Sequence, residues 1–175
     1  FLAIFAFANF EGTLSLFTES AFGLNEDDNF LVFAYIGFVL MVAQGGVYRP
    51  LAGRRSEEYL MTLGVGLMLL GLGGLAAVAY GAHVARPTPL PGETIVLEGG
   101  VPGLKPLFYA AVTVAVFGFA FVNPSISALV SKRADPARQG EVLGVNQGCS
   151  ALGRILGPLL GSTAFYLSDT RALPY

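Results

Sequence analysis

Two charged side chains stand inside apolar stretches of this sequence. Glu11 lies in a largely apolar run, and Arg154 lies in the middle of SALGRILGPLLGS (150–162). A charge facing lipid at the centre of a helix costs about 2.5–3.5 kcal/mol on insertion scales, so such residues usually face protein or a water-filled cavity. A carboxylate held there can take up and release a proton, because burial favours its neutral form. Since both lie about 20 Å from the ends of their stretches at helical rise, we expect Glu11 and Arg154 either to pair or to line one cavity.

Polar and small residues accompany both charges at helical spacing. Those near the first charge are Asn9, Ser15 and Thr18, and those near the second are Gln147, Ser150, Gly157 and Gly161. Two polar stripes at one depth predict a shared polar interior. A structural ion pair that only fixes helix packing is the alternative: the sequence favours a functional role for Glu11 and leaves both interpretations open for Arg154. Gln44 and Asn123 could contact a solute, or only join helices by hydrogen bonds.

The chain offers little to a catalytic or metal site. It has one histidine, His83, expected in a loop, and one cysteine, Cys149, so neither a zinc cluster nor an internal disulfide is expected. The expected spans hold no histidine and no carboxylate pair three or four residues apart, as a membrane-embedded enzyme would need. A net charge of −2 argues against a nucleic-acid partner. We therefore expect no enzyme, no metal and no cofactor.

The composition predicts which elements must position these side chains. Apolar residues make up 54% of the 175, and charged residues only 13%, against roughly 25% charged in soluble domains. A membrane-spanning helix needs about 20 mainly apolar residues, and five stretches approach this. We predict an all-α, polytopic membrane helix bundle, a partial transmembrane domain over 1–175, with spans at about 1–24, 30–48, 59–80, 107–130 and 140–167.

The connections carry the signals of orientation and of helix ends. Lys and Arg in short loops favour the cytoplasmic side of the membrane. In the predicted topology, six basic residues fall on one side of the membrane: Arg49, Arg54, Arg55, Lys132, Arg133 and Arg138. Three fall on the other side: Arg86, Lys105 and Arg171. The six basic residues predict that the two loops holding them are cytoplasmic, and 81–106 is then predicted to be an extracytoplasmic loop. Its segment ETIVLE could form a small strand or lie on the membrane surface. Ser56, Asp135 and the Asn and Asp residues of TESAFGLNEDDN (18–29) are expected to begin helices.

Small residues at four-residue spacing predict close contacts between helices. Two such faces occur: Gly153, Gly157 and Gly161, with Pro158 beside them, and Gly73, Ala77 and Gly81. Because a proline inside a helix removes one backbone hydrogen bond, we expect the first face to make a tight contact that can bend.

Three stretches carry a resemblance to the major facilitator superfamily, in its drug:proton antiporter-like branch. QGGVYRPLAGRR (44–55) is similar to the loop between the second and third helices of each half; Gly46, Gly53, Arg54 and Arg55 match, while Pro50 and Leu51 replace an acid and a base. The antiporter glycine pattern is matched by Gly144, Gly153, Gly157, Pro158 and Gly161, with Ser162 in place of the last glycine. The stretch 123–158 resembles the tenth and eleventh helices, which favours the second half of the family's fold.

The resemblance implies two six-helix halves that rock around a central site, with the cytoplasmic loop 44–55 as a gate. This chain would supply five helices of one half, and spans one and four would line the cavity. The partners implied are the lipid bilayer, the missing half, a small-molecule substrate and protons, in an inner or plasma membrane. We expect proton-coupled efflux by the whole protein and no transport by these 175 residues alone. The alternatives are a metabolite uptake protein or facilitator of the same fold, and a non-transporting membrane scaffold subunit.

Overall fold

The structure is a computed structural model that describes residues 1–85, 103–168 and 174–175. Within these residues it is helical throughout, which confirms the predicted all-α helix bundle. The elements are α1 (Leu2–Phe22), α2 (Glu26–Met41), a π-helix (Val42–Tyr48), α3 (Arg49–Ala52), α4 (Glu57–Val84), α5 (Leu104–Arg133), a 3-10 turn (Pro136–Arg138) and α6 (Gln139–Leu167). The predicted ETIVLE strand lies outside the described residues.

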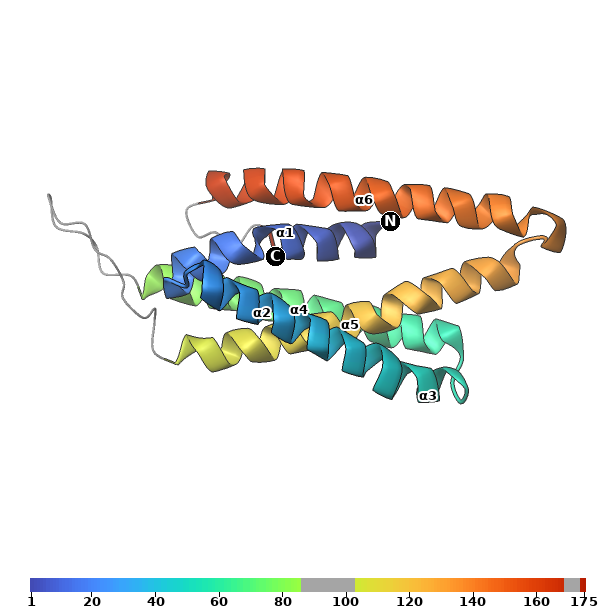
Figure 1. Cartoon of the computed structure of the whole chain (residues 1–175), viewed down its shortest axis with the longest axis horizontal. Helices are drawn as coiled ribbons and strands as arrows, with labels where there is room; N and C mark the ends of the chain where they lie inside the picture. Colours follow the sequence, from blue (N-terminus) through green and yellow to red (C-terminus); the bar gives the residue numbers. More distant parts are fainter. Residues whose placement is uncertain (86–102, 169–173) are drawn as a thin grey trace, which may run out of the picture.

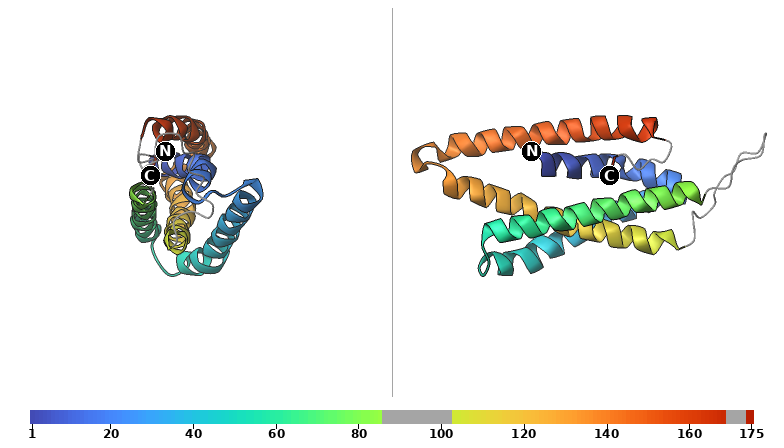
Figure 2. Two further views of the ribbon diagram at one scale, coloured as in Figure 1. Left: turned by 90° about the vertical axis from the view of Figure 1, so that its left-hand side faces the viewer. Right: turned by 180° about the vertical axis from the view of Figure 1, so that it is seen from behind.

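The helices run roughly along the long axis of the molecule, in both directions (Figure 1). α1, α4 and α6 run in one direction, whereas α2 and α5 run in the other. α6 lies along α1 at one edge of the bundle, and α4 crosses α5 beside them (Figures 1 and 2). The turn from α3 to α4 and the turn from α5 to α6 lie at the same end of the molecule, the arrangement that the basic residues of these two turns predict.

Three helical stretches are long and apolar enough to cross a membrane, namely Glu26–Ala52, Glu57–Val84 and Leu104–Arg133. Each extends a few residues beyond the predicted span, because the helix continues past the apolar run into polar caps. α1 and α6 complete the five long helices and hold the charges Glu11 and Arg154. Large apolar side chains remain exposed on the outside of the bundle, Phe30, Leu69 and Leu167 among them, as expected for a surface that meets lipid.

Helix starts follow the predicted caps. The side chain of Asn25 accepts a hydrogen bond from the backbone N–H of Asp28 (2.9 Å), and Ser56 accepts one from that of Tyr59 (3.3 Å). Asp135 accepts from the N–H of Ala137 (3.0 Å), which begins the 3-10 turn that leads into α6. These side chains satisfy N–H groups that have no partner inside the helix.

α4 and α5 cross so closely that only small residues fit between them. A Cβ added to Gly71 would overlap the backbone nitrogen of Ala115 and lie 2.6 Å from its Cβ, and one added to Gly64 would lie 2.8 Å from the Gly118 carbonyl oxygen. The prediction that Gly73, Ala77 and Gly81 form the close contact is wrong. Gly73 has no atom within 4 Å of a would-be Cβ, and the position of Ala77 is exposed. The face of α4 that packs against α5 is instead the one that carries Gly64 and Gly71.

A π-helix interrupts the rod that runs from α2 to α3. It spans Val42–Tyr48, and the N–H of Arg49 bonds to the carbonyl of Gln44, five residues back. The cause is local, because Pro50 follows directly: proline has no N–H, and its ring clashes with the carbonyl four residues before it in a regular α-helix. The wider turn, eased by Gly45 and Gly46, lets the helix continue to Ala52.

Candidate functional site

α1 and α6 form a parallel, glycine-lined seam that places the two charges. A Cβ at Gly157 would lie 2.8 Å from both the Asn9 backbone nitrogen and the Phe5 carbonyl oxygen. Gly153 lies against Phe5 in the same way, and Gly12 on α1 leaves room for Pro158, whose Cβ would be 2.7 Å from a Cβ at position 12. Small residues let the two backbones approach to contact distance, and so the seam fixes how the side chains beside it are placed.

Glu11 and Arg154 emerge beside this seam and line one cavity of about 300 Å³. Its remaining walls are contributed by α1, α2 and α5: Ile4, Phe7, Ala8, Leu40 and Phe119. Four of the five long helices therefore meet around the two charges. Neither residue belongs to any of the three ion pairs found among the described residues, and both are exposed in this chain. The structure therefore places them on one cavity without pairing them.

The apolar wall of the cavity includes a stacked aromatic pair. The Phe7 and Phe119 rings are 3.8 Å apart and almost parallel, at 6°. This contact joins α1 to α5 in the wall of the cavity that Glu11 and Arg154 also line. Leu40 extends the same apolar wall from α2. A carboxylate and a guanidinium above an apolar wall suit a solute with both polar and apolar parts.

Four other predicted pathway residues do not line this cavity. Asn9 faces the seam: its Oδ1 is buried with no hydrogen-bond partner in the described part of the chain, and a Cβ at Gly161 would collide with it. Gln44 lies half-buried in the π-helix, and Asn123 is half-buried on α5, where its backbone carbonyl accepts a hydrogen bond from Ser127 (3.2 Å). Gln147 is exposed on α6. The structure thus brings Glu11 and Arg154 together and leaves these four elsewhere.

The residues of the predicted gating loop lie at the end of the bundle, away from that cavity. Gly46 belongs to the π-helix, and Gly53, Arg54 and Arg55 form the exposed turn between α3 and α4. The antiporter-like glycines divide into two groups. Those at 153, 157 and 161 line the seam together with Pro158, whereas a Cβ at Gly144 would meet no atom within 4 Å.

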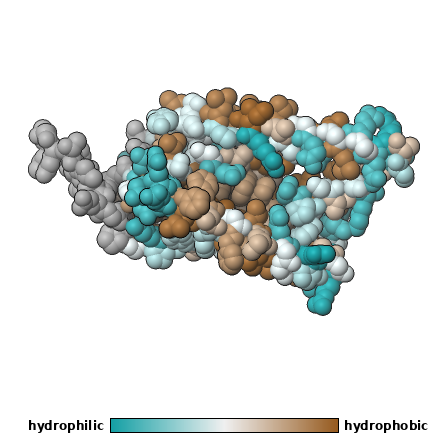
Figure 3. Space-filling view, viewed as in Figure 1, coloured by the Kyte–Doolittle hydropathy of each residue, from teal (hydrophilic) through white to brown (hydrophobic). Residues whose placement is uncertain are grey.

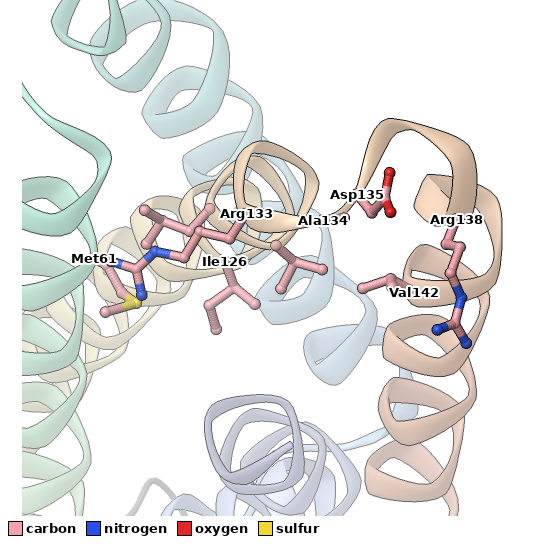
Figure 4. Close-up of a pocket in the computed structure, with 9 residues that line it drawn as sticks. Met61, Ile126, Arg133, Ala134, Asp135, Arg138 and Val142 are labelled. Carbon is pink, nitrogen blue, oxygen red and sulfur yellow. The ribbon is translucent and has the colours of Figure 1, made fainter.

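A second cavity, of about 650 Å³, was not predicted from the sequence. It lies between the ends of α4, α5 and α6 (Figure 4), with Met61 on one side, Val142 on the other and Ile126 between them. Arg133, Asp135 and Arg138 surround it. No motif marks it, because its apolar and charged lining residues come from three helices and the turn between two of them, which only the fold brings together.

Comparison with known proteins gives one family. The model of the Major Facilitator Superfamily matches residues 1–158, which include every residue that lines the cavity of Glu11 and Arg154. No solved structure matches the chain significantly.

Curated relatives extend the match to almost the whole chain. "Major facilitator superfamily domain-containing protein 10" from Mus musculus is 25% identical over 171 residues, and the protein of that name from Homo sapiens is 27% identical over 176 residues. Each match covers 98% of this chain but 32% of the relative. The chain therefore spans about a third of the length of these relatives.

Proposed function

Because the chain belongs to the major facilitator superfamily, we propose that it forms one wall of a secondary transporter that exports small solutes in exchange for protons. The family makes it part of a multi-pass membrane transporter. The coupling to protons, the outward direction and a place in the drug:proton antiporter-like branch belong to the proposal.

The observation that carries this proposal is the convergence of Glu11 and Arg154 on one cavity from two helices joined by a glycine seam. Charged residues inside a membrane are costly and usually mark a pathway for ions or solutes. In the proposal, the Glu11 carboxylate carries the proton. Arg154 supplies a positive charge that interacts with either the Glu11 carboxylate or a solute. Phe7 and Phe119 supply the apolar part of the wall.

The rest of the pathway comes from the remainder of the full-length protein. We assign the chain to the second, C-terminal half, because 123–158 resembles the tenth and eleventh helices more than the fourth and fifth. In that assignment α1 and α5 line the cavity and α6 flanks it. The two halves would rock against each other and expose the cavity to each side in turn. The loop Gly46–Arg55 would move against the other half at the inner or plasma membrane surface.

A flux measurement under an imposed pH gradient tests the proposal. Full-length protein would be reconstituted into liposomes and presented with amphipathic dyes of both charges, ethidium and sulforhodamine among them. Exchange predicts that dye accumulates when the lumen is more acidic than the bath, because protons that leave drive dye inward. Protein-free liposomes, with the same gradient, give the background.

Each of the other possible results of this flux measurement would indicate a different function. Accumulation only with the acidic bath indicates uptake together with protons, and equilibration regardless of the gradient indicates a facilitator. No dye movement above background across the panel, from protein that is folded, would favour the scaffold interpretation.

A further inference from the structure

One end of the bundle holds the α3–α4 turn and the α5–α6 turn. Some basic residues at this end form ion pairs with carboxylates, and others do not. Lys132 pairs with Glu57 (2.5 Å), Arg133 with Glu58, and Arg138 with Glu141 (2.8 Å). Those three pairs account for every ion pair among the described residues.

Three arginines at this same end have no carboxylate partner in the described part of the chain: Arg49, Arg54 and Arg55. All three are exposed within one seven-residue stretch that contains no acidic residue. The next two residues after Ser56 are acidic, but Glu57 and Glu58 turn to α5 instead. The stretch, which we call the arginine turn (Arg49–Arg55), therefore holds three uncompensated positive charges.

We propose that the arginine turn binds the phosphate groups of anionic phospholipids in the leaflet that surrounds this end of the bundle. The turn stands out from the surface as a hydrophilic projection beyond the α2 rod (Figure 3). Arginine presents a planar fork of N–H donors that matches phosphate oxygens, and clusters of basic residues beside a spanning helix attract anionic lipid headgroups.

The surroundings place the turn at headgroup depth. About two turns before Arg49 on the same rod, Met41 and Val42 are 63% and 39% exposed, as side chains that face acyl chains would be. Tyr59, on the first turn of α4, is 52% exposed and lies under the Arg55 guanidinium, 5.6 Å from ring centroid to Cζ. Tyrosine with its ring at the apolar side and its hydroxyl in water is typical of the membrane interface.

The turn is also held in place before any lipid arrives. The Tyr48 hydroxyl lies 3.2 Å from Ser125 Oγ on α5, and its ring meets the Phe121 ring edge to face at 5.6 Å. The backbone N–H groups of Arg54 and Arg55 both bond to the Leu51 carbonyl, at 2.8 and 2.9 Å. Three guanidinium groups are thus presented from a fixed backbone, which reduces the entropy lost when a phosphate binds.

The test compares two triple variants of the full-length protein that remove the same charge. One variant is Arg49→Gln with Arg54→Gln and Arg55→Gln; the control is Lys132→Gln with Arg133→Gln and Arg138→Gln, at the same end of the bundle. Each protein also carries Ala52→Cys as its single cysteine, with Cys149 and any other native cysteine replaced by serine. The cysteine is labelled with a fluorophore, and the protein is reconstituted in phosphatidylcholine with brominated phosphatidylglycerol as quencher. Brominated phosphatidylcholine measures the quenching that lipids without net charge produce.

We expect wild-type protein to be quenched more strongly by brominated phosphatidylglycerol than by brominated phosphatidylcholine. At about fivefold per basic residue near the surface, the first triple variant should lose this preference by roughly a hundredfold in relative affinity, whereas the control keeps most of it. Glycerol phosphate in the bath should not compete, which separates a lipid site from a free phosphate site.

Two results would overturn the proposal. An equal loss in both variants would mean that overall charge, and not the arginine turn, attracts the lipid. An unchanged preference in the first variant would mean that the three arginines face acidic residues elsewhere in the full-length protein. Melting temperatures of all three proteins show whether a loss comes from misfolding, and single Arg54→Gln and Arg55→Gln variants, expected to lose about fivefold each, replace any triple variant that does not fold.

Discussion

Glu11→Gln is expected to remove the gradient-driven part of dye accumulation while leaving the protein folded. Glutamine keeps the size and the hydrogen-bonding capacity of the side chain but cannot bind and release a proton. If Glu11 is the group that carries the proton through the cavity it shares with Arg154, coupling disappears and any remaining dye movement runs down its own gradient. The measurement is accumulation at equal dye concentration with and without an acidic lumen.

The same helix offers a matched control. Glu19 lies two turns further along α1, exposed near its end, and Glu19→Gln removes the same charge without touching the cavity. Its accumulation should equal that of wild type. If Glu11→Gln retains full gradient dependence, the carboxylate has no role in coupling, and its place in the cavity is structural.

Gly71→Ala is expected to destabilise the protein more than the addition of a methyl group at any other described position of α4. The new Cβ would overlap the Ala115 backbone nitrogen, which cannot rotate away as a side chain could. α4 and α5 would have to separate along their crossing, where Leu75, Val112 and Val116 are fully buried. Overpacking of this kind costs typically about 1–3 kcal/mol, occasionally more. Thermal unfolding of the full-length protein in detergent, followed by loss of helical circular dichroism, measures it.

Gly73→Ala is the control for that experiment, because it adds the same methyl group to the same helix with no atom within 4 Å. Alanine is also the better helix former by roughly 1 kcal/mol, so this variant should be as stable as wild type or slightly more so. Equal destabilisation by both substitutions would show that the crossing of α4 and α5 is looser than the structure has it.

Local sequence signals predicted the elements of this fold well. The polar caps Asn25, Ser56 and Asp135 were readable because a side chain that satisfies free N–H groups acts within three residues. The basic residues of two loops predicted that those loops share one end of the bundle. Long apolar runs predicted five long helices, and three of the helical stretches in the described residues are long and apolar enough to cross a membrane.

Features that depend on which face of a helix meets a neighbour were harder to predict. Gly71 and Gly73 are equivalent in the sequence, yet one lies at the crossing with α5 and the other in open space. Asn9 and Glu11 are two residues apart on α1, and only Glu11 reaches the cavity. A small rotation about the helix axis would exchange such residues, and tertiary packing sets that rotation.

The π-helix after α2 has a consequence for the whole rod from Glu26 to Ala52. A π-turn adds one residue to a turn without adding height, so side chains after it are rotated by about 100° relative to an unbroken α-helix. Any residue beyond Tyr48 consequently points in a different direction from the one that a single 3.6-residue period, counted from Asn25, assigns to it. Removal of one residue from Gly45–Gly46 would erase that offset and swing the following segment, guanidinium groups included, to a new side of the rod.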